Sequence, residues 1–162
     1  MRPKKKIELE PAERPAELKR SALAMLARRD YARRDLHDRL AQRYGAGDDL
    51  DQLLDWLEAQ RFIDDARYAG MFLRSRLERG HGPMRVRQSM QQEGLSAELI
   101  ETALAEADVD WFEQARQCSR RRFSGPAPAD PRERAKRLRF LQYRGFTADQ
   151  CFHALDAGSD DD

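Results

Sequence analysis

The segment MRVRQSMQQEGLSAELIETAL, residues 84–104, decides the fold because a related segment, AKRLRFLQYRGFTADQCFHAL, follows 51 residues later at 135–155. In both segments apolar residues recur at helical spacing and are followed by a glycine and then by Ser or Thr. A left-handed glycine ends one helix and a hydroxyl side chain caps the next, so each segment predicts two short helices joined by a tight turn. The positions that keep their character are the pairs Met90–Leu141, Gly94–Gly145, Leu95–Phe146, Ser96–Thr147, Ala97–Ala148, Ala103–Ala154 and Leu104–Leu155.

A weaker copy of this helix pair lies nearer the N-terminus. Leu36 and Leu40 correspond to Val86 and Met90, and the loop between the two helices is longer, reading YGAGDDLD from Tyr44. A longer helix with one apolar face precedes each pair, which gives three tandem units spaced about 48 residues apart. These longer helices are predicted at 17–29, 65–79 and 110–123.

The chain is therefore predicted to be all-α, as an elongated and curved array of three tandem three-helix repeats. No run of residues alternates between apolar and polar with a period of two, as a half-buried strand would. One unit of this size buries few side chains, so neighbouring units must stack to complete a core. We expect a flexible N-terminal arm at 1–16, repeats at 17–62, 63–108 and 109–157, and an acidic tail at 158–162.

The charged side chains are segregated along the chain. Lys and Arg number 30 against 29 Asp and Glu, so the formal net charge is only +1. Residues 67–87 contain six arginines and one acid, residues 116–144 contain ten basic residues and two acids, and residues 93–113 contain seven acids and no base. If the basic helices share a face, they form a stripe suited to an anionic partner. The alternative is that these are ordinary solvated helix faces.

The sequence predicts no enzyme, metal site or cofactor site. The two cysteines, Cys118 and Cys151, are too few for a disulfide framework and lack the spacing of metal ligands. No glycine-rich phosphate loop follows a strand. Acid pairs occur at 48–49 and 64–65, but both stand at predicted helix starts, where carboxylates bind free backbone N–H groups. The three histidines are far apart in the sequence, at His37, His81 and His153.

The chain is expected to be cytoplasmic. No stretch approaches the roughly 18 apolar residues of a membrane span. The basic N-terminus is not followed by the apolar run of a signal peptide.

The candidate site is the basic stretch RGHGPMRVRQ, Arg79–Gln88. Gly80 can end one helix and Pro83 can occupy the first turn of the next, so Gly80, Gly82 and Pro83 form a predicted hinge. Arginines on both sides could bind phosphates or carboxylates through paired hydrogen bonds. The alternative is a plain turn between helices. The predicted binding residues are Arg74, Arg76, Arg79, Arg85, Arg87, Arg116, Arg120, Arg121, Arg122, Arg137, Arg139 and Arg144.

Four motifs, in this order, resemble those of the RecX family, the regulators of the RecA recombinase. They are RFIDDARYAGMFLRSR from Arg61, GHGPMRVRQSMQQEGLS from Gly80, DWFEQARQCSRRRF from Asp110 and RFLQYRGFTADQ from Arg139. The resemblance covers roughly residues 18–155. Arg61 stands where the family usually has glycine, so either Arg61 adopts a left-handed conformation or the turn differs.

The resemblance implies three three-helix repeats without catalytic activity. It also implies a protein that lodges in the groove of RecA–DNA filaments and blocks or disassembles them. The protein would then lower three activities of RecA: strand exchange, ATP hydrolysis and the coprotease activity of the SOS response. Some members of the family bind DNA directly.

The expected partners are thus RecA and its nucleoprotein filament, together with single- or double-stranded DNA, and the protein is expected to be a monomer. Two alternatives stay open. A helix-turn-helix repressor would prefer one DNA sequence, whereas a protein-only helical scaffold would bind its partner even at high salt. The aromatic residues Trp56, Phe72, Trp111, Phe140 and Phe152 are expected to pack in the core rather than stack on bases.

Overall fold

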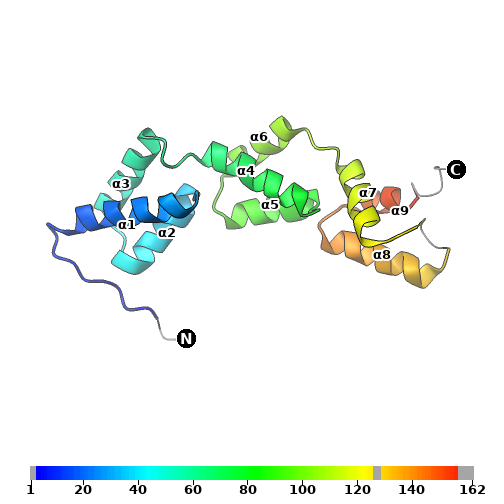
Figure 1. The fold of residues 1–162 in the computed structure, drawn as a ribbon, viewed down its shortest axis with the longest axis horizontal. Helices are drawn as coiled ribbons and strands as arrows, with labels where there is room; N and C mark the ends of the chain where they lie inside the picture. Colours follow the sequence, from blue (N-terminus) through cyan, green and yellow to red (C-terminus); the bar gives the residue numbers. More distant parts are fainter. Residues whose placement is uncertain (1–2, 126–128, 157–162) are drawn as a thin grey trace. The chain divides into compact units, whose positions relative to one another are not determined.

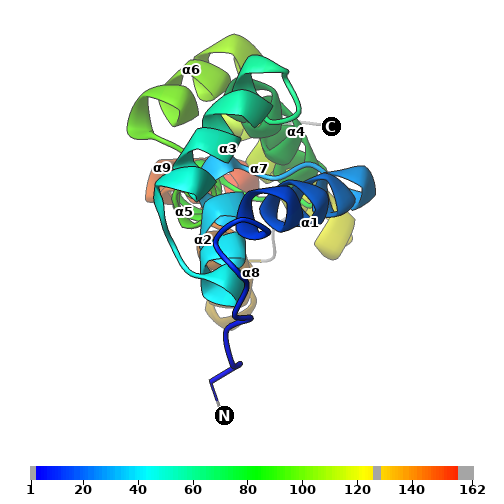
Figure 2. The same ribbon diagram turned by 90° about the vertical axis from the view of Figure 1, so that its left-hand side faces the viewer.

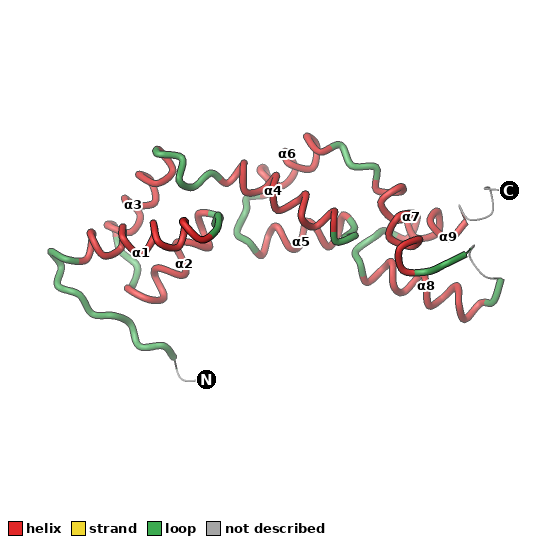
Figure 3. The backbone as a smooth tube through the Cα atoms, in the orientation of Figure 1, coloured by secondary structure: helices red, strands yellow, loops and turns green. Residues whose placement is uncertain are grey.

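The computed structural model describes residues 3–125 and 129–156, and its secondary structure within these ranges is helical. Figure 3 shows only helices and connecting loops there, which confirms the predicted all-α fold. Figure 1 labels the helices in chain order. They are α1 (Arg14–Arg28), α2 (Arg33–Tyr44), α3 (Asp48–Ala59), α4 (Asp65–Glu78), α5 (Pro83–Gln92), α6 (Ala97–Ala107), α7 (Trp111–Arg122), α8 (Pro131–Tyr143) and α9 (Ala148–Asp156).

The chain divides into two compact units. The first consists of Met1–Ala69 with Glu93–Ser96, and the second of Gly70–Gln92 with Ala97–Asp162. The three helices of the first predicted repeat lie in the first unit, whereas most of the second repeat shares a unit with the third. The predicted acidic tail lies outside the described residues.

Helices α1, α2 and α3 pack together in the first unit (Figure 2). Apolar residues recur every three or four positions, so each helix has one face that can be buried. On α2 this face consists of Leu36, Leu40 and Tyr44. The buried core comprises Leu18, Ala22, Leu36, Leu40, Tyr44, Leu50, Leu54, Leu57 and Ile63.

The segment before α1 also contacts this unit. The backbone N–H of Ile7 donates to the carbonyl oxygen of Arg43 at 2.8 Å. Leu9 packs against the core of α1, α2 and α3. Part of the predicted flexible arm therefore lies against the first repeat, and α1 itself begins at Arg14, inside the range predicted for the arm.

The two acid pairs stand at helix starts, as predicted. Asp49 accepts a hydrogen bond from the backbone N–H of the next residue at 2.8 Å. Asp64 caps α4 by accepting from the N–H of Arg67 at 3.0 Å. Asp65 instead accepts from the N–H of Arg33 at 2.8 Å, at the start of α2. Each of these three carboxylates thus binds a backbone N–H group.

The turn before α4 has the first of the two conformations left open for Arg61, the left-handed one. Arg61 has a φ of 61°, which costs a residue with a side chain roughly 1–2 kcal/mol relative to glycine. After this turn, the Tyr68 hydroxyl donates to Glu93 at 2.9 Å. Burial, and then this hydrogen bond, raise the pKa of Tyr68 to about 12.

Helices α7, α8 and α9 enclose the hydrophobic core of the third repeat. Its buried residues are Ala115, Cys118, Leu141, Phe146 and Cys151. Both cysteines are free and pack there as small apolar groups. Burial raises the pKa of the Cys151 thiol to about 11.

The turn between α8 and α9 follows the predicted pattern of glycine and hydroxyl cap. Gly145 has a φ of 96°, and Gly94, at the matching position of the second repeat, has a φ of 84°. Thr147 accepts a hydrogen bond from the Gln150 N–H at 3.3 Å, and the Gln150 side chain accepts from the Thr147 N–H at 2.9 Å. This reciprocal capping box fixes the start of α9.

Candidate functional site

Two glycine-containing turns of the second unit meet backbone to backbone. The Gly82 N–H donates to the carbonyl oxygen of Arg144 at 2.7 Å, and the Met84 N–H donates to that of Gly145 at 3.0 Å. Both donors stand at the start of α5, where backbone N–H groups have no partner within the helix. The turn after α8 therefore caps α5 with its carbonyl groups.

This contact leaves no space for a side chain at Gly82. A Cβ atom there would lie 2.4 Å from the carbonyl carbon of Gly145 and 2.5 Å from the backbone nitrogen of Phe146. A Cβ atom at Gly145 would lie 2.3 Å from the Cβ of Arg85. All three predicted hinge residues, Gly80, Gly82 and Pro83, are buried. The predicted hinge is thus a closely packed contact between two repeats.

Two side chains of the third repeat hold the end of α4 at the same contact. The Arg144 guanidinium donates to the carbonyl oxygen of Arg79 at 3.0 Å. The Gln114 carboxamide donates to the carbonyl oxygen of Leu77 at 2.7 Å. Carbonyl groups at a helix end lack partners within the helix. The Leu77 carbonyl also accepts from the Gly80 N–H at 3.0 Å, so the Gln114 side chain adds a second bond there.

His81 is buried in the middle of this contact, with 5% of its surface exposed. Burial lowers the pKa of its imidazole to about 4, and four nearby arginines contribute to the shift. Its Nδ1 atom has no hydrogen-bond partner among the described residues. The side chain is therefore neutral at physiological pH. The four arginines are Arg85, Arg76, Arg144 and Arg79.

The buried imidazole predicts a loss of stability in mild acid. The folded state holds His81 neutral down to a pH of about 4, whereas the unfolded chain binds the proton near its ordinary pKa of 6.5. His81 should therefore lower the free energy of unfolding as the pH falls from about 6.5 to about 4, by up to about 3 kcal/mol.

Urea unfolding of the wild type and of His81→Gln across this pH range measures the effect. The difference between the two free energies of unfolding isolates His81 from the carboxylates that titrate in the same range. A difference that does not change with pH would show that folding does not lower the pKa of His81.

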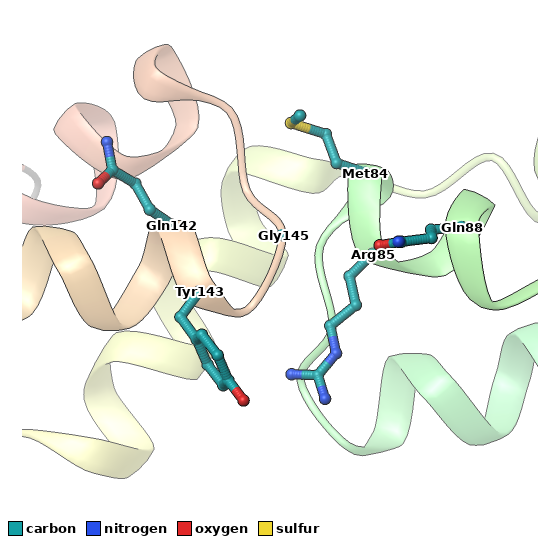
Figure 4. Close-up of a pocket in the computed structure, with 6 residues that line it drawn as sticks. All are labelled: Met84, Arg85, Gln88, Gln142, Tyr143 and Gly145. Atoms are coloured by element: carbon teal, nitrogen blue, oxygen red, sulfur yellow. The ribbon is translucent and has the colours of Figure 1, made fainter.

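A pocket beside the glycine contact combines an exposed aromatic ring with a cation and two carboxamides (Figure 4). Tyr143 is 78% exposed and Met84 is 61% exposed. The Arg85 guanidinium, from α5, lies 5.4 Å from the centroid of the Tyr143 ring, and Figure 4 shows the two side chains pointing toward each other. We call this site, of about 410 Å³, the Tyr143 pocket; it is lined by Met84, Arg85, Gln88, Gln142, Tyr143 and Gly145.

A second pocket of the same unit gathers four of the predicted arginines. Its volume is about 240 Å³, and Glu78 is the one carboxylate among its lining residues. The guanidinium groups of Arg144 and Arg122 lie 5.1 and 5.8 Å from the centroid of the Phe140 ring. This arrangement is suited to a phosphate or a carboxylate. We call it the Arg121 pocket; it is lined by Glu78, Arg79, Gly80, Cys118, Arg121, Arg122, Phe140 and Arg144.

Some of the predicted binding arginines are engaged by groups of the second unit that do not belong to either pocket. Arg87 forms an ion pair with Glu101 at 2.9 Å, and Arg116 forms one with Glu113 at 3.3 Å. Arg137 donates to two loop carbonyls, at 3.3 and 3.4 Å. These three side chains are engaged in local structure, so they are weaker candidates for binding a partner.

The remaining predicted arginines do not line either pocket, although Arg76 lies near His81 together with Arg79, Arg85 and Arg144. Arg76 is half-buried, with its guanidinium 4.6 Å from the centroid of the Phe72 ring. Arg74, Arg120 and Arg139 are exposed and lie outside both pockets. Of the predicted arginines, those that line one of the two pockets are Arg79, Arg85, Arg121, Arg122 and Arg144.

Sequence reasoning missed Met84, Gln88, Gln142 and Tyr143. An available signal was the position of Tyr143, two residues after the buried Leu141. An aromatic residue off the apolar stripe of a basic helix must face solvent or a partner. The two glutamines carry no comparable signal.

Among residues 3–125 and 129–156, no group of three or more His, Cys, Asp or Glu side chains is arranged to hold a metal ion. Within the same ranges, no helix combines the length and the apolar character needed to cross a membrane.

These features define a helical-repeat protein whose candidate site is an arginine-lined surface at the contact between two repeats. Two family models match the chain: RecX, second three-helix domain, over residues 64–104, and RecX, third three-helix domain, over residues 108–155. The chain belongs to the RecX family.

Relatives and solved structures agree with this assignment. The chain is 43% identical over 142 residues to the regulatory protein RecX of Halorhodospira halophila, a match that covers 88% of each sequence. It is 46% identical over 134 residues to that of Chromohalobacter salexigens, with 83% of this chain and 88% of the relative covered. The crystal structure of RecX from Lactobacillus salivarius shares the fold, with a TM-score of 0.76 at 19% identity, over 88% of this chain and 95% of that one.

Proposed function

We propose that this chain binds the RecA recombinase, alone or in its nucleoprotein filament, and inhibits its recombinase, ATPase and coprotease activities. In the cell this would modulate DNA repair and the SOS response. Membership of a family of regulatory proteins supports a regulatory role, and the four motifs described above support RecA as the target. The observation that carries the proposal is the Arg121 pocket, because it concentrates four cations around one carboxylate.

The chemistry of this surface suits an anionic partner. A guanidinium group binds a phosphate or a carboxylate through two parallel hydrogen bonds. Phosphates are supplied by the DNA of a filament and carboxylates by the acidic side chains of a protein. Arg122 and Arg144 lie over Phe140, which restricts their guanidinium groups before any partner arrives. Because these side chains are already restricted, they lose less conformational entropy when a partner binds.

The packed contact between the repeats also restricts the positions of the arginines. The Gly82–Arg144 and Met84–Gly145 hydrogen bonds fix α5 relative to the turn after α8. Arg85 on one side and Arg144 on the other are consequently presented in one arrangement. The protein would act by occupying RecA surface as a non-catalytic cytoplasmic monomer without a cofactor. Single- or double-stranded DNA would be a further ligand.

Binding to RecA filaments assembled on single-stranded DNA tests the proposal. When the filaments are sedimented, this protein should sediment with them, and the bound amount should saturate. The logarithm of the binding constant should fall linearly with the logarithm of the salt concentration, because binding releases counterions from the DNA. Filaments on DNA of unrelated sequences should bind equally well. A preferred DNA sequence without RecA would indicate a repressor, and binding unaffected by salt would indicate a protein-only scaffold. No binding to RecA at low salt would contradict the proposal.

A further inference from the structure

Another basic pocket lies in the first unit. It shares no lining residue with the Tyr143 pocket or the Arg121 pocket. Its volume is about 800 Å³. The segment before α1 supplies part of its lining, and α1 and α2 supply the rest, so we call it the arm pocket. The lining residues are Lys4, Lys5, Ile7, Met25, Arg28, Arg39, Gln42 and Arg43.

Local contacts hold the segment that carries the two lysines. The Ile7 N–H donates to the Arg43 carbonyl oxygen at 2.8 Å, which joins the segment to the end of α2. Leu9, two residues further on, packs against the hydrophobic core of the unit. A backbone hydrogen bond and an apolar anchor therefore bring Lys4 and Lys5 to the pocket.

The lining of the arm pocket is strongly cationic. Five of its eight residues carry a positive charge, and none carries a carboxylate. Arg39 is bound to Asp35 at 2.9 Å, but Lys4, Lys5 and Arg28 form no ion pair with any residue of the described ranges. Like charges gathered in this way repel one another, and an anionic ligand relieves the repulsion.

We propose that the arm pocket binds the phosphate backbone of single-stranded nucleic acid, as an anchor distinct from the Arg121 pocket. The cations come from three segments of the chain around an open volume, which suits several successive phosphates better than one small anion. Basic N-terminal arms commonly bind nucleic acid in this way. Ile7 is exposed and Met25 is half-buried in the lining, so both offer apolar contact to a base that is not stacked.

This inference deepens the proposed function, because it locates a site for the DNA ligand in the first repeat. The phosphate-binding cations are Lys4, Lys5, Arg28 and Arg43. A strand held here would be bound without any contribution from the second unit. The arm pocket should therefore contribute to binding of bare DNA, in the absence of RecA.

The test is fluorescence anisotropy of a labelled oligothymidylate titrated with the full chain, without RecA. The variant replaces the four cations together, as Lys4→Gln, Lys5→Gln, Arg28→Gln and Arg43→Gln. Its Kd should rise by at least about 10-fold at physiological salt. The slope of the logarithm of the binding constant against the logarithm of the salt concentration should become shallower by about 3. Each phosphate contact on a single strand contributes roughly 0.7 to this slope, and the variant removes four cations.

A matched control removes the same charge elsewhere, as Lys19→Gln, Arg61→Gln, Arg132→Gln and Lys136→Gln. All four residues are exposed and none lines the arm pocket. The control should keep the Kd within about 2- to 3-fold of the wild type, since it lowers only the long-range attraction. Circular dichroism should show the same helicity for both variants.

Three results would overturn the inference. The four-residue variant could bind oligothymidylate as the wild type does, or the control could lose as much affinity as the variant. The third result would be that polyglutamate binds the wild type as tightly as oligothymidylate does and no longer binds the four-residue variant. That result would assign the arm pocket to an acidic protein segment. Failure of the proposed function would look different: the wild type would bind bare DNA normally but would not bind RecA filaments.

Discussion

Gly82→Ala is expected to destabilise the protein by about 2–4 kcal/mol. The new Cβ would lie 2.4 Å from the Gly145 carbonyl carbon and 2.5 Å from the Phe146 nitrogen, and both atoms belong to backbone that cannot move aside cheaply. Separating the two turns would also break the hydrogen bond from the Gly82 N–H to Arg144. From the sequence alone, replacing Gly82 and Pro83 with alanine would be expected to change the stability by only about 1 kcal/mol, because alanine favours a helix where glycine does not.

Urea unfolding measures this loss, and Gly70→Ala is the matched control. Gly70 lies inside α4, where a Cβ atom would lie 3.6 Å from the Arg74 guanidinium, an ordinary contact. Alanine favours a helix more than glycine does, so the control should be stabilised by up to about 1 kcal/mol. A Gly82→Ala protein as stable as the wild type would show that the two turns separate freely in solution.

The second large effect is expected on inhibition. Replacing Arg79, Arg121 and Arg122 with glutamine removes three of the four cations of the Arg121 pocket. If each guanidinium contributes about 1 kcal/mol to binding, the concentration that half-inhibits RecA should rise by about 100-fold. Arg144 is left in place because it also holds the Arg79 carbonyl and supports the fold.

The control for this triple variant removes three arginines that are bound to carboxylates. Arg87 pairs with Glu101 at 2.9 Å, and Arg116 pairs with Glu113 at 3.3 Å. The third is Arg134, whose partner Asp156 lies at 3.2 Å. Their replacement with glutamine changes the net charge equally but should leave the half-inhibitory concentration within about 3-fold, since exposed ion pairs contribute little. Equal losses in the two triple variants would show that only net charge matters.

Much of the fold was predictable because local chemistry determines it. The glycine and hydroxyl pattern predicts the turn at Gly145 and the cap at Thr147, and both are present. The helix starts at the acid pairs follow from the same local rules, as Asp64 shows by capping α4. Such features depend on residues a few positions apart, which a single sequence displays directly.

The candidate site was only partly predictable because it depends on contacts between segments far apart in the sequence. The Gly82 turn is packed by the Gly145 turn, 63 residues away, which no local rule reveals. Arg87 is exposed by its helix position, yet Glu101 from the next helix binds it. Sequence patterns assign arginines to a basic surface but do not show which of them are already paired.

The aromatic residues show the same limit. Five were expected to pack in the core, but Trp56 is 37% exposed and Phe152 is 48% exposed. Phe140 is half-buried beneath the guanidinium groups of the Arg121 pocket. Removing its ring should therefore cost less than the 3–5 kcal/mol typical of a fully buried phenylalanine.

One measurement tests the central claim most directly: the ATPase rate of RecA on single-stranded DNA, titrated with this protein at substoichiometric amounts. The proposal predicts that the wild type lowers the rate well before it equals RecA in number, because one bound molecule affects many RecA subunits of a filament. It predicts that the triple variant of Arg79, Arg121 and Arg122 needs about 100-fold more protein for the same effect. An ATPase rate that stays constant up to equal amounts of wild-type protein and RecA would contradict it.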